Sequence, residues 1–418
     1  MPVVAWNDVQ FRTDSSARFR RADRGRHQRH PADRRHREHQ RGRRGERPGG
    51  GPRRGDRAHR HHQRRAALQP AVRVAAGAHP HRRLTVSGEG RGSAEQRALD
   101  LEKTADWYRR FRRLETPGQS ELYADWAGGI ETDAEVLRLI ITLPRPKRQP
   151  NLIFASARLL GAPLAAYPVV REWLIEHWPA VAAEALVRAT QTNEPRRLTA
   201  IMPILAAIGP RVALIEVGAS AGLCLYPDRY SYDYSGQRVD PADGPSPVLL
   251  QADTTGPVPL PAHPPEVLWR AGIDLNPLDV RDPADVRWLQ TLVWPEQTER
   301  RRRLDAALDI VRRDPPHLVR GDAAGGLEAL VARAPEGVPL VIVSPAVLVY
   351  LAPADREAFA DSVTALGRWI SLDGAGVLPR VDAQLPQAPV PGDYTVSLDG
   401  RPVARCGAHG QTLDWLAG

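Results

Sequence analysis

An acidic residue and three small residues stand at the end of an apolar run in the middle of the chain, where they could hold a cofactor. The run 212–217 contains Glu216, and Gly218, Ser220 and Gly222 follow it. Glycine adopts positive φ angles and lets a neighbour approach the backbone, so such a turn can cradle a nucleoside. We therefore expect Gly218→Val to abolish ligand binding with the fold retained. The alternative is architectural, because such a turn also lets a helix pack closely on a strand.

Two further acids follow apolar runs, and the same chemistry applies to them. Asp274 closes the run 267–274, and Asp322 closes the run 317–322. In an open α/β sheet the carboxyl ends of the strands meet at one edge, where ligands bind. We therefore predict that Glu216, Asp274 and Asp322 line a ligand site at that edge.

The second half of the sequence has the rhythm of an α/β sheet. Short apolar runs alternate with stretches of helical spacing after residue 211, as in βαβ units. The run 212–215 is apolar throughout, which suits a central parallel strand covered on both faces. Proline-rich stretches at 241–265 and 385–392 are predicted to be loops. The pattern predicts strands at 211–217, 267–274, 317–322, 339–344 and 368–373, helices near 283–313, 324–334 and 353–366, and a closing hairpin at Tyr394–Leu398 and Pro402–Cys406.

The first half has helical spacing instead. Apolar side chains recur at intervals of three or four between residues 95 and 208, with interruptions at Pro117 and Pro144. Residues 151–160, 168–177 and 179–189 continue this pattern. The chain is therefore predicted to carry a helical cap at 95–208 and a sheet domain at 209–418.

Polar side chains interrupt the apolar pattern of the cap. They are costly to bury unless they meet partners or a ligand, which makes them candidates for substrate contacts. The plain alternative is that they cap helices or close loops, since Thr192-Asn193-Glu194-Pro195 is typical of a helix boundary. The candidates are Gln149, Asn151, Gln191, Asn193 and Glu194.

Two further clusters each allow two interpretations. Tyr230, Tyr232 and Tyr234 could line a pocket beside the glycine turn, which makes Tyr230 a candidate substrate contact, but alternation of two also fits one face of a strand. The charged run 299–303 could contact a phosphate or an acidic substrate. Such a run is also typical of a solvated helix face with ion pairs four residues apart.

The glycine turn resembles a motif of a known enzyme class. Glu216-Val-Gly218-Ala-Ser-Ala-Gly222 is similar to the first motif of class I S-adenosylmethionine-dependent methyltransferases, with Ser220 in place of the usual middle glycine. The resemblance implies a Rossmann-like, methyltransferase-type sheet. It also implies that residues 218–222 curve under the methionine part of S-adenosylmethionine, which would be the cofactor.

The same resemblance gives the other two acids their roles. It implies that Asp274 holds the ribose hydroxyls and that Asp322 binds the adenine amine. The fourth predicted strand ends in Val343-Ser344-Pro345, which differs from the motif of nucleobase and amide N-methyltransferases. A base-methylating activity is accordingly disfavoured.

Longer strings are shared with one bacterial family. They are Arg148-Gln-Pro-Asn151, Thr190-Gln-Thr-Asn-Glu194, Glu216-Val-Gly-Ala-Ser-Ala-Gly-Leu223, Asp228-Arg-Tyr230, Trp294-Pro-Glu-Gln297 and Gly321-Asp322. On these strings residues 100–418 resemble an uncharacterised bacterial family, domain of unknown function 2332. This resemblance names no substrate, so the methyltransferase hypothesis is a fold-level analogy.

The charge of the chain is unevenly distributed. Residues 1–90 hold 23 Arg, no Lys and 8 acidic residues, whereas residues 91–418 hold 35 basic and 41 acidic residues. A segment so charged and so poor in aromatics cannot bury enough apolar surface to fold, so the leader at 1–94 is predicted to be disordered. Arg, Gly, Pro, Ala and His without Lys are what a GC-rich gene yields when it is read upstream of its true start or out of frame, and we expect this origin for the leader. The alternatives are an arm that binds nucleic acid and a transit peptide.

Other classes of site are disfavoured. Cys224 and Cys406 give no disulfide framework, and the four histidines after the leader show no metal-binding spacing. No apolar stretch approaches the 18 or more residues of a membrane span. We therefore expect a cytoplasmic protein with a small-molecule partner and no metal, membrane or nucleic-acid partner. The sequence does not predict an oligomeric state.

Together these patterns favour a methyltransferase that uses S-adenosylmethionine on an unidentified small molecule, with catalytic residues that the sequence does not identify. The alternative is a non-catalytic protein that keeps a nucleoside-binding fold as a sensor or an interaction module. Oxidoreductase chemistry ranks third, because the spacing of Gly218, Ser220 and Gly222 lacks the longer dinucleotide fingerprint.

Overall fold

The structure is a computed structural model that describes residues 89–191 and 193–416. Predictions for residues 1–88, the disordered leader among them, lie outside the described residues. The first described helix, α1, begins at Glu89. The helical part therefore begins before the boundary at 94/95 that the sequence predicts.

Residues 89–208 are helical, as the spacing of their apolar side chains predicts. Ser120 begins α2 by accepting a hydrogen bond from the N–H of Tyr123, and Asp133 caps α3 in the same way. The two stretches on either side of Pro179 form one helix rather than two. The elements are α1 (Glu89–Leu114), α2 (Glu121–Ile130), α3 (Ala134–Ile140), η3 (Arg145–Lys147), α4 (Pro150–Leu159), α5 (Tyr167–Val187), η4 (Pro195–Arg197) and α6 (Leu198–Ile208).

The helices share a core with a segment from the second half of the chain. Trp294 lies between α7 (Pro283–Leu292) and α8 (Thr298–Arg313). The centroid of its ring lies 5.6 Å from that of Phe111 and 5.4 Å from that of Tyr123. Arg158 of α4 donates hydrogen bonds to two carbonyls of the same segment, at 2.9 Å each. These contacts attach the α7–α8 connection to the helical part.

One sheet contains all the strands in the part of the chain that the structure describes. Its order is β3-β2-β4-β11-β10-β9-β8-β7-β1-β5-β6. The five strands from β6 to β8 are parallel, and the order reverses at β1, which lies between β5 and β7. The strands are β1 (Arg211–Val217), β2 (Ser231–Tyr234), β3 (Gln237–Val239), β4 (Leu249–Thr255), β5 (Glu266–Asp274), β6 (His317–Arg320), β7 (Leu340–Pro345), β8 (Arg368–Gly374), β9 (Tyr394–Leu398), β10 (Arg401–Cys406) and β11 (Thr412–Trp415).

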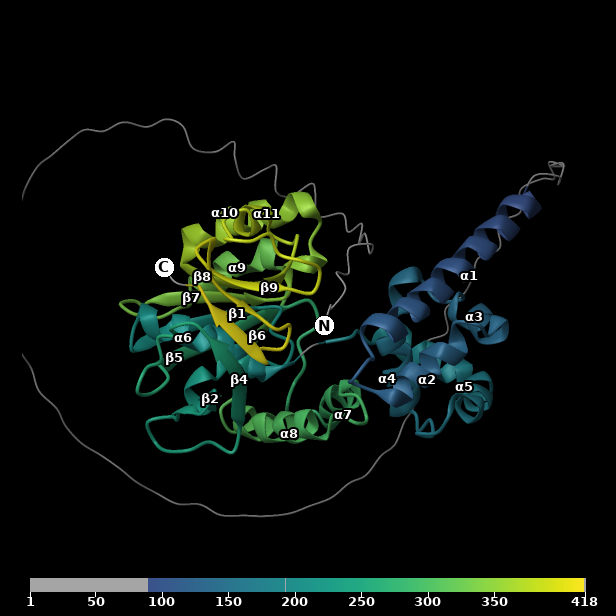
Figure 1. The fold of residues 1–418 in the computed structure, drawn as a ribbon, viewed down its shortest axis with the longest axis horizontal. Helices are drawn as coiled ribbons and strands as arrows, with labels where there is room; N and C mark the ends of the chain where they lie inside the picture. Colours follow the sequence, from purple (N-terminus) through teal and green to yellow (C-terminus); the bar gives the residue numbers. More distant parts are fainter. Residues whose placement is uncertain (1–88, 192, 417–418) are drawn as a thin grey trace, which may run out of the picture. The chain divides into compact units, whose positions relative to one another are not determined.

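Helices cover both faces of β1, which explains its continuous apolar run. Val212 and Leu214 belong to a buried cluster that includes side chains of α6 and α8. Ile215 and Val217 belong to a second cluster with α9 (Ala323–Val331) and α10 (Pro353–Leu366). Figure 1 shows α9, α10 and α11 (Pro379–Asp382) together beside β8 and β9. Alternate side chains of a strand point to opposite faces, so each face of β1 is buried.

The described fold is a mixed α/β protein with a large, mostly parallel sheet. The predicted parallel strands and the closing hairpin are present. Three predictions are corrected. β4 lies inside the stretch 241–265 that was expected to be a loop, the helical stretch 283–313 is divided at Trp294-Pro295, and β6 ends at Arg320. β4 pairs with β2 and β11, and such long-range partners leave little local pattern. The division into a cap at 95–208 and a domain at 209–418 stays a prediction.

Candidate functional site

The turn after β1 has the left-handed backbone that its glycines predict. The φ angle is 75° at Gly218, 50° at Ser220 and 75° at Gly222. For a serine this conformation costs about 1–2 kcal/mol, because Cβ crowds the following carbonyl oxygen. Strained residues of this kind persist only where their surroundings fix them, and they cluster at functional sites. Two short 3₁₀ segments, η5 (Leu223–Leu225) and η6 (Pro227–Arg229), follow the turn directly.

Asp274 fixes this turn against the end of β5. The N–H of Ser220 donates to Oδ2 of Asp274 at 2.8 Å, and the N–H of Asn276 donates to Oδ1 at 2.7 Å. The N–H of Gly218 donates to the carbonyl of Ile273 at 2.9 Å. An ionised carboxylate has about four acceptor sites, so Asp274 keeps capacity for further donors. The structure thus brings two of the predicted site residues, Ser220 and Asp274, into direct contact.

The two glycines of the turn are packed against other parts of the chain. A Cβ built on Gly218 would lie 2.6 Å from a methyl group of Val347, and one on Gly222 would lie 2.8 Å from Cγ of Pro316. Carbon atoms in contact are normally about 3.5–4.0 Å apart. Packing within the chain therefore explains why these positions are glycine.

Glu216 is the buried acid at the end of β1, with 4 % of its surface exposed. Its Oε2 has no hydrogen-bond partner among the described residues. Burial raises the pKa of Glu216 well above its usual value, a rise that the charge of Arg197 opposes and the charge of Asp274 reinforces. The fold consequently favours the neutral carboxylic acid, which can donate a hydrogen bond as well as accept one.

Gln191 and Asn193, two of the predicted substrate contacts, form hydrogen bonds with the glycine turn. Ser220 Oγ donates to Oε1 of Gln191 and accepts a hydrogen bond from Nδ2 of Asn193. Gln191 also donates from Nε2 to the carbonyl of Asn276 at 2.7 Å. These contacts join the segment after α5 to the turn after β1 and to the loop after β5.

Glu194 is a buried anion held by two arginines of α8. Its carboxylate lies 2.9 Å from Arg300 and 3.1 Å from Arg303, and only 1 % of the residue is exposed. Burial acts to raise the pKa of Glu194, but the two positive charges outweigh it and lower the pKa to about 2. On the charged run 299–303, Arg301 pairs with Asp305 four residues on. Arg301 thus belongs to a solvated helix face, whereas Arg300 and Arg303 neutralise Glu194.

Of the other predicted substrate contacts, Gln149 and Asn151 lie away from the turn. Oε1 of Gln149 accepts from the hydroxyl of Thr190 at 3.0 Å. Oδ1 of Asn151 accepts from Nε1 of Trp294 at 2.9 Å, within the helical core. Tyr230 is fully buried just before β2, and its hydroxyl donates at 2.9 Å to the carbonyl of Leu223, the residue that follows the glycine turn. The side chain of Tyr230 therefore lies beside the turn.

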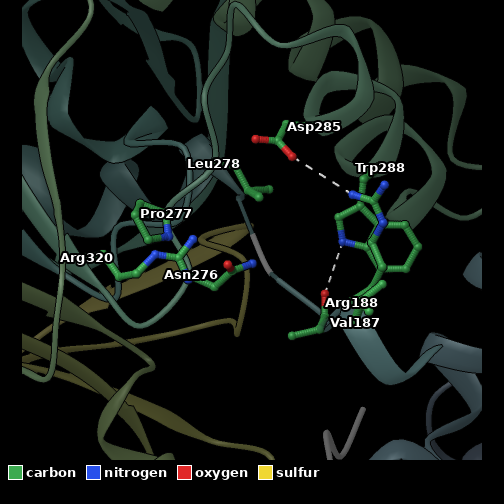
Figure 2. A pocket seen from close by; sticks show the side chains of 9 residues that line it. Val187, Arg188, Asn276, Pro277, Leu278, Asp285, Trp288 and Arg320 are labelled. Atoms are coloured by element: carbon green, nitrogen blue, oxygen red, sulfur yellow. Dashed lines mark hydrogen bonds and ion pairs between the residues drawn. The ribbon is translucent and has the colours of Figure 1, made fainter. Parts of the chain in front are cut away.

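A cavity of about 240 Å³ adjoins the strand ends. One wall consists of Asn276, Pro277 and Leu278, which follow β5, and of Arg320, the last residue of β6. Arg320 is the register partner of Asp274. Figure 2 shows Arg188, Asp285 and Trp288 on the facing wall. The remaining lining residues are Val187 and Ala189.

Asp322, the third predicted acid, lies on the loop between β6 and α9. The residue is exposed, and its carbonyl accepts hydrogen bonds from the N–H groups of Gly325 and Gly326. It stands two residues after Arg320, which lines the cavity. The sequence thus placed the acid at the correct strand end, although the strand stops before it.

Two buried charged residues at the same edge were not predicted. Asp373 lies near the end of β8 with 4 % exposure, and neither carboxylate oxygen has a hydrogen-bond partner in the described chain. Arg197 donates to the carbonyls of Pro345 at 2.9 Å and Ala408 at 3.3 Å. The strand-end rule that selected Glu216 would also have found Asp373, but no local pattern marks Arg197.

Metal ligands and membrane-spanning helices were both sought among the described residues. No group of three or more His, Cys, Asp or Glu side chains is arranged there to hold a metal ion. No helix within residues 89–416 has the length and apolar character that a membrane crossing needs.

The fold and the site define a mixed α/β protein whose candidate ligand site lies at the carboxyl ends of parallel strands, beside the reversal of strand order. Its sequence matches the family described as "Uncharacterized protein conserved in bacteria (DUF2332)" over residues 105–415, and the chain belongs to that family. No curated protein matches it.

Proposed function

We propose that the protein is a methyltransferase that binds S-adenosylmethionine at the carboxyl edge of its parallel strands and acts on a small molecule. The observation that carries the proposal is the hydrogen bond from the N–H of Ser220 to Asp274. It joins a strained small-residue turn to an acid on the neighbouring strand, where open α/β sheets bind nucleosides.

The residues at this edge suit the adenosyl half of the cofactor. Asp274 has acceptor sites left for a ribose diol, and the exposed Asp322 could accept a hydrogen bond from an adenine amine. Glu216 contributes a buried oxygen that has no partner among the described residues. A cavity of about 240 Å³ adjoins Asn276 in the same loop. It is slightly smaller than the roughly 300–1,000 Å³ of most ligand pockets.

The place expected for the methionine half fits less well. Val347 occupies the space beside Gly218, and the side chains of Gln191 and Asn193 bond to Ser220. A methionine group over the turn would have to displace these amides. When bound, S-adenosylmethionine supplies an electrophilic methyl group, and this chain would contribute the positioning of the cofactor and the acceptor.

The same amides favour a second candidate function, a nucleoside-binding sensor without catalysis. Gln191 bonds both Ser220 and the carbonyl of Asn276, so it ties the turn to the loop after β5. A site closed over the turn would bind the adenosyl part and leave no room for transfer. The two candidates therefore predict the same nucleoside contacts and differ in turnover.

Equilibrium binding to the full chain tests the shared part of both candidates. S-adenosylmethionine, its demethylated product, adenosine, NAD and ATP are compared by calorimetry and by thermal shift. Asp322→Ala should weaken adenosyl binding by about tenfold, the loss of roughly one hydrogen bond to a charged group. Glu328→Ala on the exposed side of α9 is the matched control and should leave binding unchanged.

Incubation with labelled S-adenosylmethionine and a metabolite extract then separates the two candidates. A labelled product supports the methyltransferase, and tight binding without product supports the sensor. Failure of every adenosyl ligand to bind would rule out both. Cytoplasmic location and a small-molecule partner belong to the same proposal.

A further inference from the structure

The cavity beside the strand ends contains a guanidinium that no acid of the described residues neutralises. On one wall, Arg188 pairs with Glu184 at 3.2 Å and with Asp285 at 3.9 Å. On the other wall, Arg320 forms no ion pair with any described residue. Its one polar contact there is the carbonyl of Leu275, 3.4 Å from Nη1. Since Arg188 and Asp285 offset each other, the lining keeps one net positive charge.

Asn276 adds side-chain donors next to this guanidinium. Its backbone N–H and carbonyl are engaged by Asp274 and Gln191, whereas its amide makes no hydrogen bond to a described residue. Figure 2 shows the amide of Asn276 and the guanidinium of Arg320 at the same cavity. An arginine carries five N–H donors and an asparagine amide carries two, so the wall offers more donors than the protein uses.

The facing wall is held in place by contacts of Arg188 and Trp288. The guanidinium of Arg188 lies over the ring of Trp288, 5.2 Å from its centroid. Nε1 of Trp288 donates to the carbonyl of Ala189 at 3.1 Å. The space between the walls is about 240 Å³, enough for several water molecules. A phosphate group with a small carbon skeleton fits such a volume.

We propose that this cavity binds the phosphate group of a small molecule, with Arg320 and Asn276 as the recognising side chains. A guanidinium fork and an amide together match the several acceptor oxygens of a phosphate, and charge-assisted hydrogen bonds are the strong ones. The proposal goes beyond the proposed function, because S-adenosylmethionine carries no phosphate. The phosphate belongs either to a nucleotide whose sugar lies at Asp274 or to a separate phosphorylated metabolite.

Calorimetry on the full chain tests the proposal with inorganic phosphate, adenosine 3′-monophosphate, adenosine and glycerol 3-phosphate. Arg320→Ala should weaken the binding of the phosphate probes by about tenfold or more. Arg320→Lys should weaken it by less, since lysine keeps the positive charge but lacks the forked guanidinium. Asn276→Leu keeps the side-chain size and should also weaken the binding of these probes. Arg313→Ala, which removes an exposed arginine at the end of α8, is the matched control.

The probes identify the source of the phosphate. If adenosine 3′-monophosphate binds more strongly than adenosine and Arg320→Ala removes this difference, the phosphate belongs to a nucleotide. Equal binding of adenosine and adenosine 3′-monophosphate, together with Arg320-dependent binding of glycerol 3-phosphate, assigns the phosphate to a separate metabolite. The proposal is overturned if no phosphate probe binds at millimolar concentration, or if Arg320→Ala and Arg313→Ala behave alike. Binding of S-adenosylmethionine, measured with the same variants, reports independently on the proposed function.

Discussion

Ser220 and Asp274 are joined by a hydrogen bond of 2.8 Å from the backbone N–H of the serine to Oδ2 of the aspartate. The bond connects the turn after β1 to the end of the neighbouring strand β5 and holds a serine at φ 50°. The same carboxylate also accepts the N–H of Asn276, in the loop that lines the cavity. One acid thus shapes both the glycine turn and the cavity wall.

Removal of this carboxylate should release the turn. Asp274→Ala loses two hydrogen bonds to a charged acceptor, so we expect the free energy of unfolding to fall by about 2–4 kcal/mol. Asp309→Ala removes an exposed carboxylate that pairs with Arg312 three residues on, and should change the free energy of unfolding by less than about 1 kcal/mol. Urea unfolding measures both variants. Equal effects would show that Asp274 is not an anchor of the turn.

A side chain at Gly218 should destabilise the fold, contrary to the expectation from sequence. Gly218 has φ 75°, and an added Cβ would approach Val347 to 2.6 Å. Gly337→Ala is the matched control, because Gly337 has φ 76° and open space around it. We expect about 1–2 kcal/mol of destabilisation for Gly337→Ala, the backbone cost alone, and clearly more for Gly218→Ala.

A double variant separates the clash from the backbone cost. Gly218→Ala combined with Val347→Ala should cost less than the sum of the two single changes, because the shortened side chain makes room for the new Cβ. Additive free energies of unfolding would mean that Val347 does not limit this position.

The sequence predicts those parts of the fold that depend on local pattern. β1 is predicted to the residue, since burial of both its faces makes the apolar run continuous. The contact of Ser220 with Asp274 follows from the rule that parallel strands end at one edge. Arg320 escapes prediction, because an exposed arginine at a strand end has no local signal. Its role depends on how Arg188 and Trp288, distant in sequence, form the facing wall.

Other parts of the site depend on contacts that no local pattern encodes. Gln191 and Asn193 were predicted to matter, but their bonds to Ser220 depend on where the chain after α5 returns to the sheet. Gln149 and Asn151 had equally polar surroundings in sequence and instead hold Thr190 and Trp294. Polarity within an apolar stretch therefore indicates a required partner, and the tertiary fold decides whether that partner is a ligand site.

The buried ion group at Glu194 should make stability depend on acid pH. Its pKa is about 2 in the fold against 4.5 for an ordinary glutamate, so the stabilisation is present above pH 4.5 and is lost as pH falls towards 2. His409 acts in the same direction, because burial lowers its pKa to about 3 and the unfolded chain takes up a proton below pH 6.5. These two groups thus lower the unfolding free energy between pH 6.5 and 2, and Asp373 opposes the decline between pH 7 and 4.

Replacement of Glu194 tests this group at neutral pH. Glu194→Gln leaves Arg300 and Arg303 without their buried counter-charge, so we expect a loss of about 3–5 kcal/mol at pH 7. The free energy of unfolding of the variant should also fall less steeply below pH 4.5 than that of the parent chain. Glu299→Gln removes an exposed acid of α8, the helix that carries both arginines. Its free energy of unfolding should lie within about 1 kcal/mol of that of the parent chain. A similar small loss for Glu194→Gln would contradict the buried ion group.

Asp373 should reduce stability as the pH rises, the reverse of Glu194. Burial raises its pKa from 3.8 to about 7, against the charges of Arg356 and Arg197, and its oxygens have no partner among the described residues. Between pH 4 and 7 the unfolded chain has lost this proton while the fold retains it, so folding becomes less favourable. The space around the side chain is too small to admit water.

Asp373→Asn keeps the shape and removes the titration. The variant should match the parent chain at pH 4 and be more stable than it at pH 8, by up to about 4 kcal/mol if the whole shift is expressed. Urea unfolding at the two pH values gives the comparison, and Asp399→Asn, a partly exposed acid paired with Arg368, is the control. An Asp373→Asn variant less stable than the parent at pH 8 would mean that the ionised carboxylate has a compensating partner, for which Arg356 and Arg197 are the candidates.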